Sequence, residues 1–293
     1  MTGCRCIANT SGSGKTRRIL ESLTVYWGFY FVATPDGNGV GIRDLQYTLE
    51  GLTLNAYWED DLDIDDKDRA GRRRKSATNH RIATRAFRKV LAARIVAFEL
   101  FLEAVIEVDK KLESKHKHYW LLFQLNLQAE FKNKHPVVQI MKDCLHGASN
   151  DALEQLIDRL PGICAKYIPA THFIVAVDEA QQAVRKYPHS FVSTTDDRKY
   201  RSVIREIAIV FTAQPLEIKL VVSGTGVTMD DLRDSVASGV SKRSTVSLYH
   251  DLGMFDTWSK LKEFLKRYLP AKFLESPSGL RLQQRMREYL LGR

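Results

Sequence analysis

The chain has 293 residues, of which 44% are hydrophobic and 27% charged, with a formal net charge of +9. This length suits one large domain or two small ones with a buried core. No run approaches the roughly 18 apolar residues of a membrane span, and Arg5 interrupts the only apolar stretch near the N-terminus, so we expect neither a membrane segment nor a signal peptide. Four cysteines, two of them in C-x-C spacing, are too few for a disulfide framework. We therefore expect reduced, buried thiols and a cytoplasmic or nuclear location.

Strands and helices are predicted to alternate along the chain, which favours an α/β fold. The fold class we expect is a P-loop NTPase: a mostly parallel sheet flanked by helices, with a large helical insertion between the second strand and the strand at 172–177. The first strand is weak, because it is short and carries Arg5. The apolar pattern predicts strands at 3–8, 26–33, 172–177, 218–223 and 247–250, and helices at 16–23, 82–112, 150–160, 196–211, 258–268 and 280–291. The apolar segment 119–127 could be helix or strand, and we favour a helix.

We predict a single domain. Its core would comprise residues 1–58 and 165–270, and a C-terminal helix at 278–293 would start a lid. Between the two parts of the core we expect a charged, exposed and mobile linker at 59–80 and a helical insertion at 81–160.

Charge is concentrated on either side of residue 67. Residues 59–66 hold six acids and no base, whereas 67–94 hold eleven Lys or Arg and one acid, a local charge of +10. Such a block is typical of a tail, a loop or one helix face. Arg81, Arg85 and Arg88 would share a helix face, and 67–94 would contact a nucleic-acid backbone or, through Arg72–Lys75, act as a nuclear localisation signal. A solvated segment neutralised by the acids before it is the alternative.

The sequence from Asn9 to Thr16, NTSGSGKT, closely follows the P-loop pattern G-x-x-x-x-G-K-[ST] between a strand and a helix. Glycines let successive backbone N–H groups point at phosphates, and the helix start adds its positive dipole end. Asn9 replaces the first glycine, and Asn tolerates positive φ better than most residues. We predict that Lys15 reaches the β- and γ-phosphates of ATP and that Thr16 is a ligand of Mg²⁺. The expected nucleotide-binding residues are Asn9, Ser11, Gly12, Ser13, Gly14, Lys15, Thr16, Arg17 and Thr225.

Asp178 and Glu179 follow the apolar strand that ends at Val177. Ligands of open α/β sheets bind outside the carboxyl ends of the strands, so Asp178 would hold Mg²⁺ and Glu179 would polarise the attacking water. The expected catalytic residues are thus Lys15, Asp178 and Glu179, and the metal ligands Thr16 and Asp178. A second buried strand, 219–223, would place Ser223 or Thr225 near the γ-phosphate; a glycine-permitted turn with no nucleotide contact is equally open. Arg201, Arg205, Lys242 and Arg243 are candidates for a further phosphate clamp.

These segments together resemble a known family. The segments are NTSGSGKTR, YFVA with its Asp-Gly loop, VDEAQ, SGTG and GMFDT. They are similar to segments of crinkler-type proteins and, more broadly, of crinkler and retrotransposon-hotspot P-loop NTPases of oomycetes, fungi and trypanosomatids. The closing segment 285–293 resembles the passage of that module into its lid. The resemblance implies a nucleotide site at Gly12, Gly14, Lys15, Thr16, Asp178 and Glu179. It assigns none of the family's effector activities to residues of this chain.

Three functions remain open at this stage. The first is Mg-dependent ATP hydrolysis coupled to a conformational or nucleic-acid-related role. The second is a nucleotide-gated switch with little turnover, which Asn9 and the weak first strand would suit. The third is a nucleic-acid-binding protein that uses 67–94. Base preference and oligomeric state are not encoded in any motif.

Overall fold

The computed structural model describes residues 3–8, 14–34, 40–63, 68–126, 135–168, 172–193, 198–213, 216–224, 245–249 and 257–290. The chain divides into two units, each described here by itself. The first comprises Met1–Ala8 and Lys15–Tyr249, and the second comprises Asn9–Gly14 and His250–Arg293.

A parallel sheet of five strands forms the centre of the first unit, and its order is β2-β3-β4-β1-β5. All neighbouring strands are parallel, with Val32 opposite Asp178 and Val177 opposite Val222. This confirms the α/β class and the parallel sheet flanked by helices, including the weak first strand, which lies between β4 and β5. The strands are β1 (Gly3–Ala8), β2 (Gly28–Val32), β3 (Phe173–Asp178), β4 (Ile218–Gly224) and β5 (Thr245–Tyr249).

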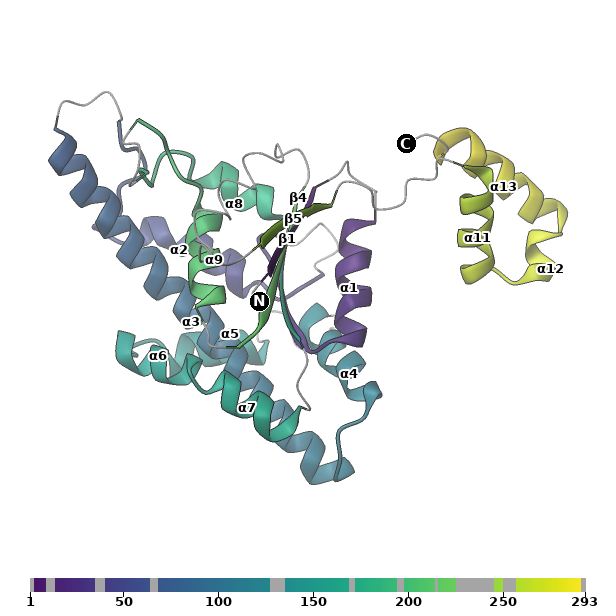
Figure 1. Cartoon of the computed structure of the whole chain (residues 1–293), viewed down its shortest axis with the longest axis horizontal. Helices are drawn as coiled ribbons and strands as arrows, with labels where there is room; N and C mark the ends of the chain where they lie inside the picture. The colour runs from purple at the N-terminus through teal and green to yellow at the C-terminus, as the bar shows by residue number, and fades with distance from the viewer. Residues whose placement is uncertain are drawn as a thin grey trace. The chain divides into compact units, whose positions relative to one another are not determined.

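Helices cover both faces of the sheet (Figure 1). Successive strand residues point to opposite faces, so Tyr30 and Val32 pack with α1 and α4, whereas Phe29 and Phe31 belong to the larger core on the other face. That larger core is built with α2, α3, α8 and α9. The helices named here are α1 (Lys15–Val25), α2 (Asp44–Gly51), α3 (Arg69–Asp109), α4 (Ser114–Leu125), α8 (Ala180–Lys186) and α9 (Val203–Thr212).

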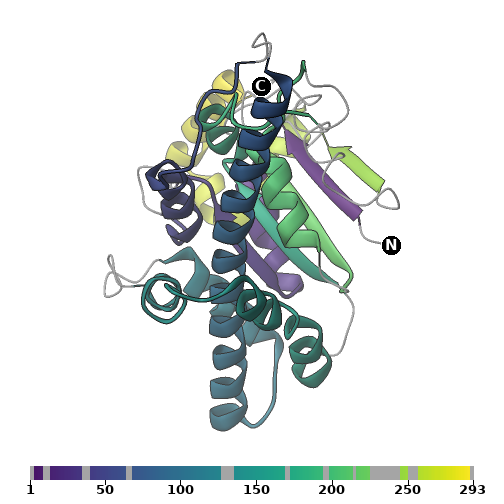
Figure 2. The same cartoon turned by 90° about the vertical axis from the view of Figure 1, so that its left-hand side faces the viewer.

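Helix α3 corrects the expected linker at 59–80, because its 41 residues begin at Arg69. Figure 2 shows α3 running along the unit beside the sheet. Arg and Lys are strong helix formers, and two buried polar side chains anchor the first turns. Arg72 donates to the Asp63 carbonyl (3.0 Å), and Asn79 donates to the carbonyls of Glu59 and Ser190. A block read as linker from its charge is therefore helix from residue 69 onward.

Shorter elements complete the insertion and the second unit. The helix expected to end at Pro161-Gly162 ends earlier, and Pro161 lies in the first turn of a new helix, where its missing N–H costs nothing. The helix expected from residue 196 begins only at Val203, after the capping hydroxyl of Ser202. The remaining elements are η1 (Leu52–Leu54), α5 (Pro136–Gln139), the π-helical turn η2 (Ile140–Cys144), α6 (Asn150–Ile157) and α7 (Leu160–Tyr167), with α11 (Trp258–Tyr268), α12 (Ala271–Leu274) and α13 (Pro277–Leu290) in the second unit.

The cysteines differ from the expectation at one position. Cys164 is buried, and burial raises the pKa of its thiol to about 12, but Cys144 is exposed at the end of η2. Cys4 and Cys6 have side chains outside the described residues. Among the helices that the structure describes, none is both long and apolar enough to cross a membrane.

Candidate functional site

The carboxyl ends of β3 and β4 meet the start of α1 at one edge of the sheet. The crossover from β1 to β2 runs through α1 on one face, whereas the crossover from β3 to β4 runs through α8 and α9 on the other. Divergent crossovers of this kind open a crevice at the carboxyl edge, where α/β proteins bind ligands. The predicted residues Lys15, Thr16, Asp178 and Glu179 all lie at this edge.

Helix α1 opens with two of the predicted residues. Gly14 directly precedes it at φ 81°, a backbone conformation that L side chains rarely adopt. Lys15 is only 7% exposed, and this burial lowers the pKa of its ammonium against the opposing effect of Asp178 and Glu179. A lysine in this position is a cation held away from water close to two acids.

Asp178 is the centre of the hydrogen bonds at this edge and is itself 2% exposed. The Thr16 hydroxyl donates to its Oδ2 at 2.6 Å, and the Tyr30 hydroxyl donates to the same oxygen at 3.2 Å. Its Oδ1 accepts the backbone N–H of Glu179 at 3.0 Å. Residues from α1, β2 and β3 thus converge on a single carboxylate.

Glu179 has a left-handed backbone conformation, with φ 54° and ψ 33°, and caps the start of α8. Its carboxylate accepts a hydrogen bond from the side-chain amide of Gln181, which is 4% exposed. Gly224 lies against that amide, since a Cβ on Gly224 would stand 2.9 Å from Gln181 Oε1. Strained backbone at a sheet edge costs roughly 1–3 kcal/mol and is concentrated at functional sites.

Ser223 brings a buried hydroxyl to the same edge. It follows Val222, the residue opposite Val177, so its register position is beside Asp178. Its side chain is fully buried, and its Oγ finds no hydrogen-bond partner in the part of the chain that the structure describes. Such an orphaned hydroxyl calls for an explanation in a native fold, and contact with a bound ligand is one explanation.

The other expected site residues are placed as follows. Arg17 pairs with Glu21 on its own helix (Nε–Oε1 2.7 Å), on a partly exposed face. Arg205 pairs with the buried Glu206 (2.9 Å), and with Arg201 it lines a separate depression beside His80. Asn9, Ser11, Gly12, Ser13, Thr225, Lys242 and Arg243 lie outside the described residues.

The donor set at this edge suits a hard cation that is completed by its substrate. Among the described residues no group of three or more His, Cys, Asp or Glu side chains could hold a metal ion by itself. Thr16 and Asp178 supply one hydroxyl and one carboxylate, both oxygen donors. Mg²⁺ is commonly held by one or two carboxylates together with substrate phosphates and water rather than by a full protein cage. The residues present therefore fit Mg²⁺ bound together with a phosphorylated ligand.

Two residues at this edge were missed by the sequence analysis. Tyr30 lies in an aromatic strand that reads as core, and only the pairing of β2 with β3 directs its hydroxyl to Asp178. Gln181 is part of VDEAQ, but no motif assigns it a role. Its position two residues after Glu179, at the start of a helix, is the feature of the sequence that could have indicated its contact with Glu179.

Comparison with known proteins adds no relative to this description. No protein-family model, curated protein or solved structure matches the chain.

Proposed function

We propose that the chain binds a nucleoside triphosphate, ATP with Mg²⁺, at the carboxyl edge of its sheet and hydrolyses it. The observation that carries this proposal is the 2.6 Å hydrogen bond from the Thr16 hydroxyl to the Asp178 carboxylate. It joins the residue after the P-loop lysine to the acid at the end of a buried parallel strand. These are the two protein groups between which a P-loop protein holds its magnesium ion.

The roles of the residues follow from their surroundings. Lys15 offers a desolvated ammonium, and electrostatic attraction to phosphate oxygens is strongest where water is excluded. Thr16 and Asp178 would ligate Mg²⁺, which when bound neutralises developing phosphate charge. Tyr30 holds the Asp178 carboxylate in place.

Glu179 is the group that would accept a proton. When water attacks ATP, a bond forms between the water oxygen and the γ-phosphorus, and the bond between the γ-phosphorus and the bridging oxygen of the β-phosphate breaks. The proton of the attacking water passes to the Glu179 carboxylate. Gln181 orients that carboxylate through its amide. The resemblance to crinkler-type NTPases agrees with this proposal.

Nucleotide binding is tested with a matched pair of variants on α1. Lys15→Ala removes the buried ammonium, whereas Arg18→Ala removes an equal charge from an exposed position on the same helix. We expect Lys15→Ala to lose Mg-ATP binding in calorimetry by at least about 100-fold, and Arg18→Ala to bind like wild type. Equal affinity in the two variants would contradict the proposal.

Hydrolysis is tested separately, because a nucleotide-gated switch with little turnover is the second candidate. The contact of Gln181 with Glu179 favours that candidate, since the amide donates to one of the two carboxylate oxygens that could accept the proton of water. Steady-state phosphate release should fall about 100-fold or more in Glu179→Gln with ATP affinity preserved. Equal, very slow release in both proteins would leave the switch as the function of the site.

A further inference from the structure

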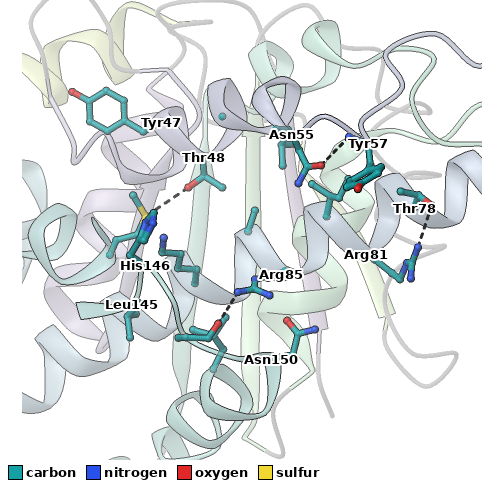
Figure 3. Close-up of a pocket in the computed structure, with 18 residues that line it drawn as sticks. Tyr47, Thr48, Asn55, Tyr57, Thr78, Arg81, Arg85, Leu145, His146 and Asn150 are labelled. Carbon is teal, nitrogen blue, oxygen red and sulfur yellow. Dashed lines mark hydrogen bonds between the residues drawn. The ribbon is translucent and has the colours of Figure 1, made fainter. Parts of the chain in front are cut away.

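A cleft of about 730 Å³ lies beside α3, and none of the residues of the proposed nucleotide site lines it (Figure 3). Its walls come from α2 and the turn after η1, from the middle of α3, and from the segment between η2 and α6. No Asp or Glu is among the residues that line it.

Three cations of α3 line this cleft at intervals of one helical turn: Arg81, Arg85 and Lys89. This differs from the expected face of Arg81, Arg85 and Arg88, because Arg88 points to α6 and pairs with Glu154 at 2.5 Å. Positions four apart on a helix are separated by roughly 6 Å along the axis. The cleft therefore presents a row of positive charge rather than a single point.

The cations in the cleft differ from three other basic residues of α3, each of which pairs with an acid. Lys75 pairs with Glu59, Arg88 with Glu154 and Arg94 with Asp44. By contrast, Arg81 donates to the Thr78 hydroxyl (3.2 Å) and Arg85 to the Ala148 carbonyl (2.8 Å), both neutral acceptors. Within the described ranges none of the three forms an ion pair. Burial and the neighbouring Arg85 also lower the pKa of Lys89.

None of the acids before α3 that the structure describes forms an ion pair with this row. Glu59 pairs with Lys75, and the Asp61 carboxylate contacts His189, both away from the cleft. The alternative reading, neutralisation by the preceding acids, is seen at Lys75 and, among the described residues, not at Arg81, Arg85 or Lys89. Three unpaired cations in one hollow repel one another, and an anionic ligand would remove that repulsion.

The rim carries aromatic and amide groups. Tyr57 is 77% exposed, and its backbone N–H is fixed by Asn55 Oδ1 at 3.0 Å. Asn55 and Tyr57 lie on one side of Arg85 and Asn150 on the other (Figure 3). An exposed tyrosine ring beside a row of cations is the arrangement that stacks a base while the cations contact the phosphates. An acidic protein segment would need the cations but not the ring.

We propose that this cleft binds single-stranded nucleic acid, with Arg81, Arg85 and Lys89 on successive phosphates and Tyr57 stacked on a base. The cleft is open to solvent. This site goes beyond the proposed ATP site and uses none of its residues.

The test is fluorescence anisotropy of the full chain with a labelled, mixed-sequence single strand of about 12 nucleotides. The triple variant Arg81→Gln/Arg85→Gln/Lys89→Gln is compared with Lys111→Gln/Arg185→Gln/Lys186→Gln, which removes the same charge from exposed positions elsewhere. We expect the first to lose affinity more than tenfold, with a salt dependence shallower by about 2 in log–log slope, and the second to lose less than about threefold. Equal losses would overturn the site.

A second pair of variants tests the base contact separately from charge. Tyr57→Ala should weaken binding roughly tenfold, whereas Tyr57→Phe should retain it, because stacking needs the ring and not the hydroxyl. Wild-type affinity in Tyr57→Ala, or equally strong competition by a polyglutamate of matched charge, would overturn nucleic acid as the ligand. Circular dichroism of each variant establishes that α3 is intact, and Mg-ATP binding should be unchanged in all of them.

Discussion

Glu179 combines a strained backbone with the carboxylate proposed as the proton acceptor. A residue other than glycine at φ 54° gives up about 1 kcal/mol relative to glycine at the same position. The strain directs the chain from β3 into α8 while keeping the side chain beside Gln181. Function and stability therefore oppose each other at this residue.

Comparing two substitutions at position 179 measures that opposition. Both Glu179→Gly and Glu179→Ala remove the carboxylate, so both should lose phosphate release. Glu179→Gly should exceed Glu179→Ala in free energy of unfolding by about 1 kcal/mol, since only glycine adopts this φ without strain. Urea denaturation at neutral pH measures the difference. Equal stabilities would show that the left-handed conformation carries no strain.

Ser223 is a site where removing a polar group should not lower the stability of the nucleotide-free chain. Its buried Oγ has no partner among the described residues, and an unsatisfied buried hydroxyl costs about 1–3 kcal/mol. Without nucleotide, Ser223→Ala should therefore be at least as stable as wild type in thermal unfolding. If Ser223 contacts the bound triphosphate, the same variant should gain less stability than wild type from saturating Mg-ATP. A variant less stable without nucleotide would show that Ser223 has a partner in the folded chain.

His135 makes the folded chain sensitive to mild acid. It is 2% exposed, its Nε2 bonds to the Phe123 carbonyl (3.0 Å), and its Nδ1 accepts the Val137 N–H (3.3 Å). Desolvation lowers its pKa from 6.5 to about 4, with the nearby Arg94 adding to the effect. The folded chain thus holds this imidazole neutral.

The sign of the pH effect follows from that preference. Above pH 6.5 the His135 imidazole is neutral in both the folded and the unfolded chain, so its contribution to the free energy of unfolding is fully present. As the pH falls toward 4, the imidazole of the unfolded chain takes up a proton first, so the free energy of unfolding declines. The loss attributable to His135 should be of the order of 3 kcal/mol. His135→Asn, which keeps a capping side chain, should flatten the stability profile between pH 6.5 and 4, whereas His118→Asn at an exposed site should not. An unchanged slope in His135→Asn would contradict this assignment.

At the scale of elements, helices protect the edge strand β2 and lock it to the insertion. The Gly28 carbonyl accepts Trp120 Nε1 (2.8 Å), and the Tyr30 N–H donates to Gln124 Oε1 (2.9 Å), so α4 satisfies backbone groups that an edge strand would otherwise expose. Gln124 also accepts from Arg94 at 3.2 Å. One side chain thus connects β2, α4 and α3.

Arg94 and Asp44 join α3 to α2 through a fully buried ion pair. Arg94 donates from Nε (2.6 Å) and Nη2 (3.0 Å) to the two oxygens of Asp44, and both side chains are 0% exposed. Removing Asp44 leaves the Arg94 charge buried without a partner, so Asp44→Ala should lower the free energy of unfolding by about 3–5 kcal/mol. The double variant Asp44→Leu/Arg94→Met should recover much of that loss in denaturant unfolding. An equally severe loss in the double variant would contradict the charge argument.

Elements with a regular apolar pattern could be predicted from the sequence. Element bounds and side-chain roles that depend on contacts with residues distant in the chain could not. The runs at 173–177 and 218–223 are continuous and apolar, and both are strands. The proximity of Thr16 to Asp178 followed from the shared carboxyl edge of parallel strands. The start of α3 depended on Arg72 and Asn79 bonding to residues distant in the chain, which no local pattern reveals. The same holds for Tyr30, whose role depends on register.

At the scale of the molecule, ligand linkage offers a test of the nucleotide site. A ligand that binds only the folded chain stabilises it by about 2.7 kcal/mol at 100 times its Kd. Mg-ATP should therefore raise the Tm of wild type and of Arg18→Ala in a concentration-dependent way. Lys15→Ala should show no shift under the same conditions, as measured by differential scanning calorimetry. A Tm shift of the same size in Lys15→Ala would place nucleotide binding elsewhere.

The position of β1 between β4 and β5 has a consequence for the timing of assembly. β1 comes first in the chain, yet its partners begin near Lys219 and Thr245, so its backbone groups have no sheet to join until the rest of the sheet exists. Strand pairings between residues this far apart in the sequence form slowly, because most of the intervening chain must be ordered before the pairing contacts stabilise the fold. Helix α1, which begins at Lys15 and follows β1 in the chain, is then positioned late in folding. If the proposed function holds, a newly made chain would bind nucleotide only when folding is nearly complete.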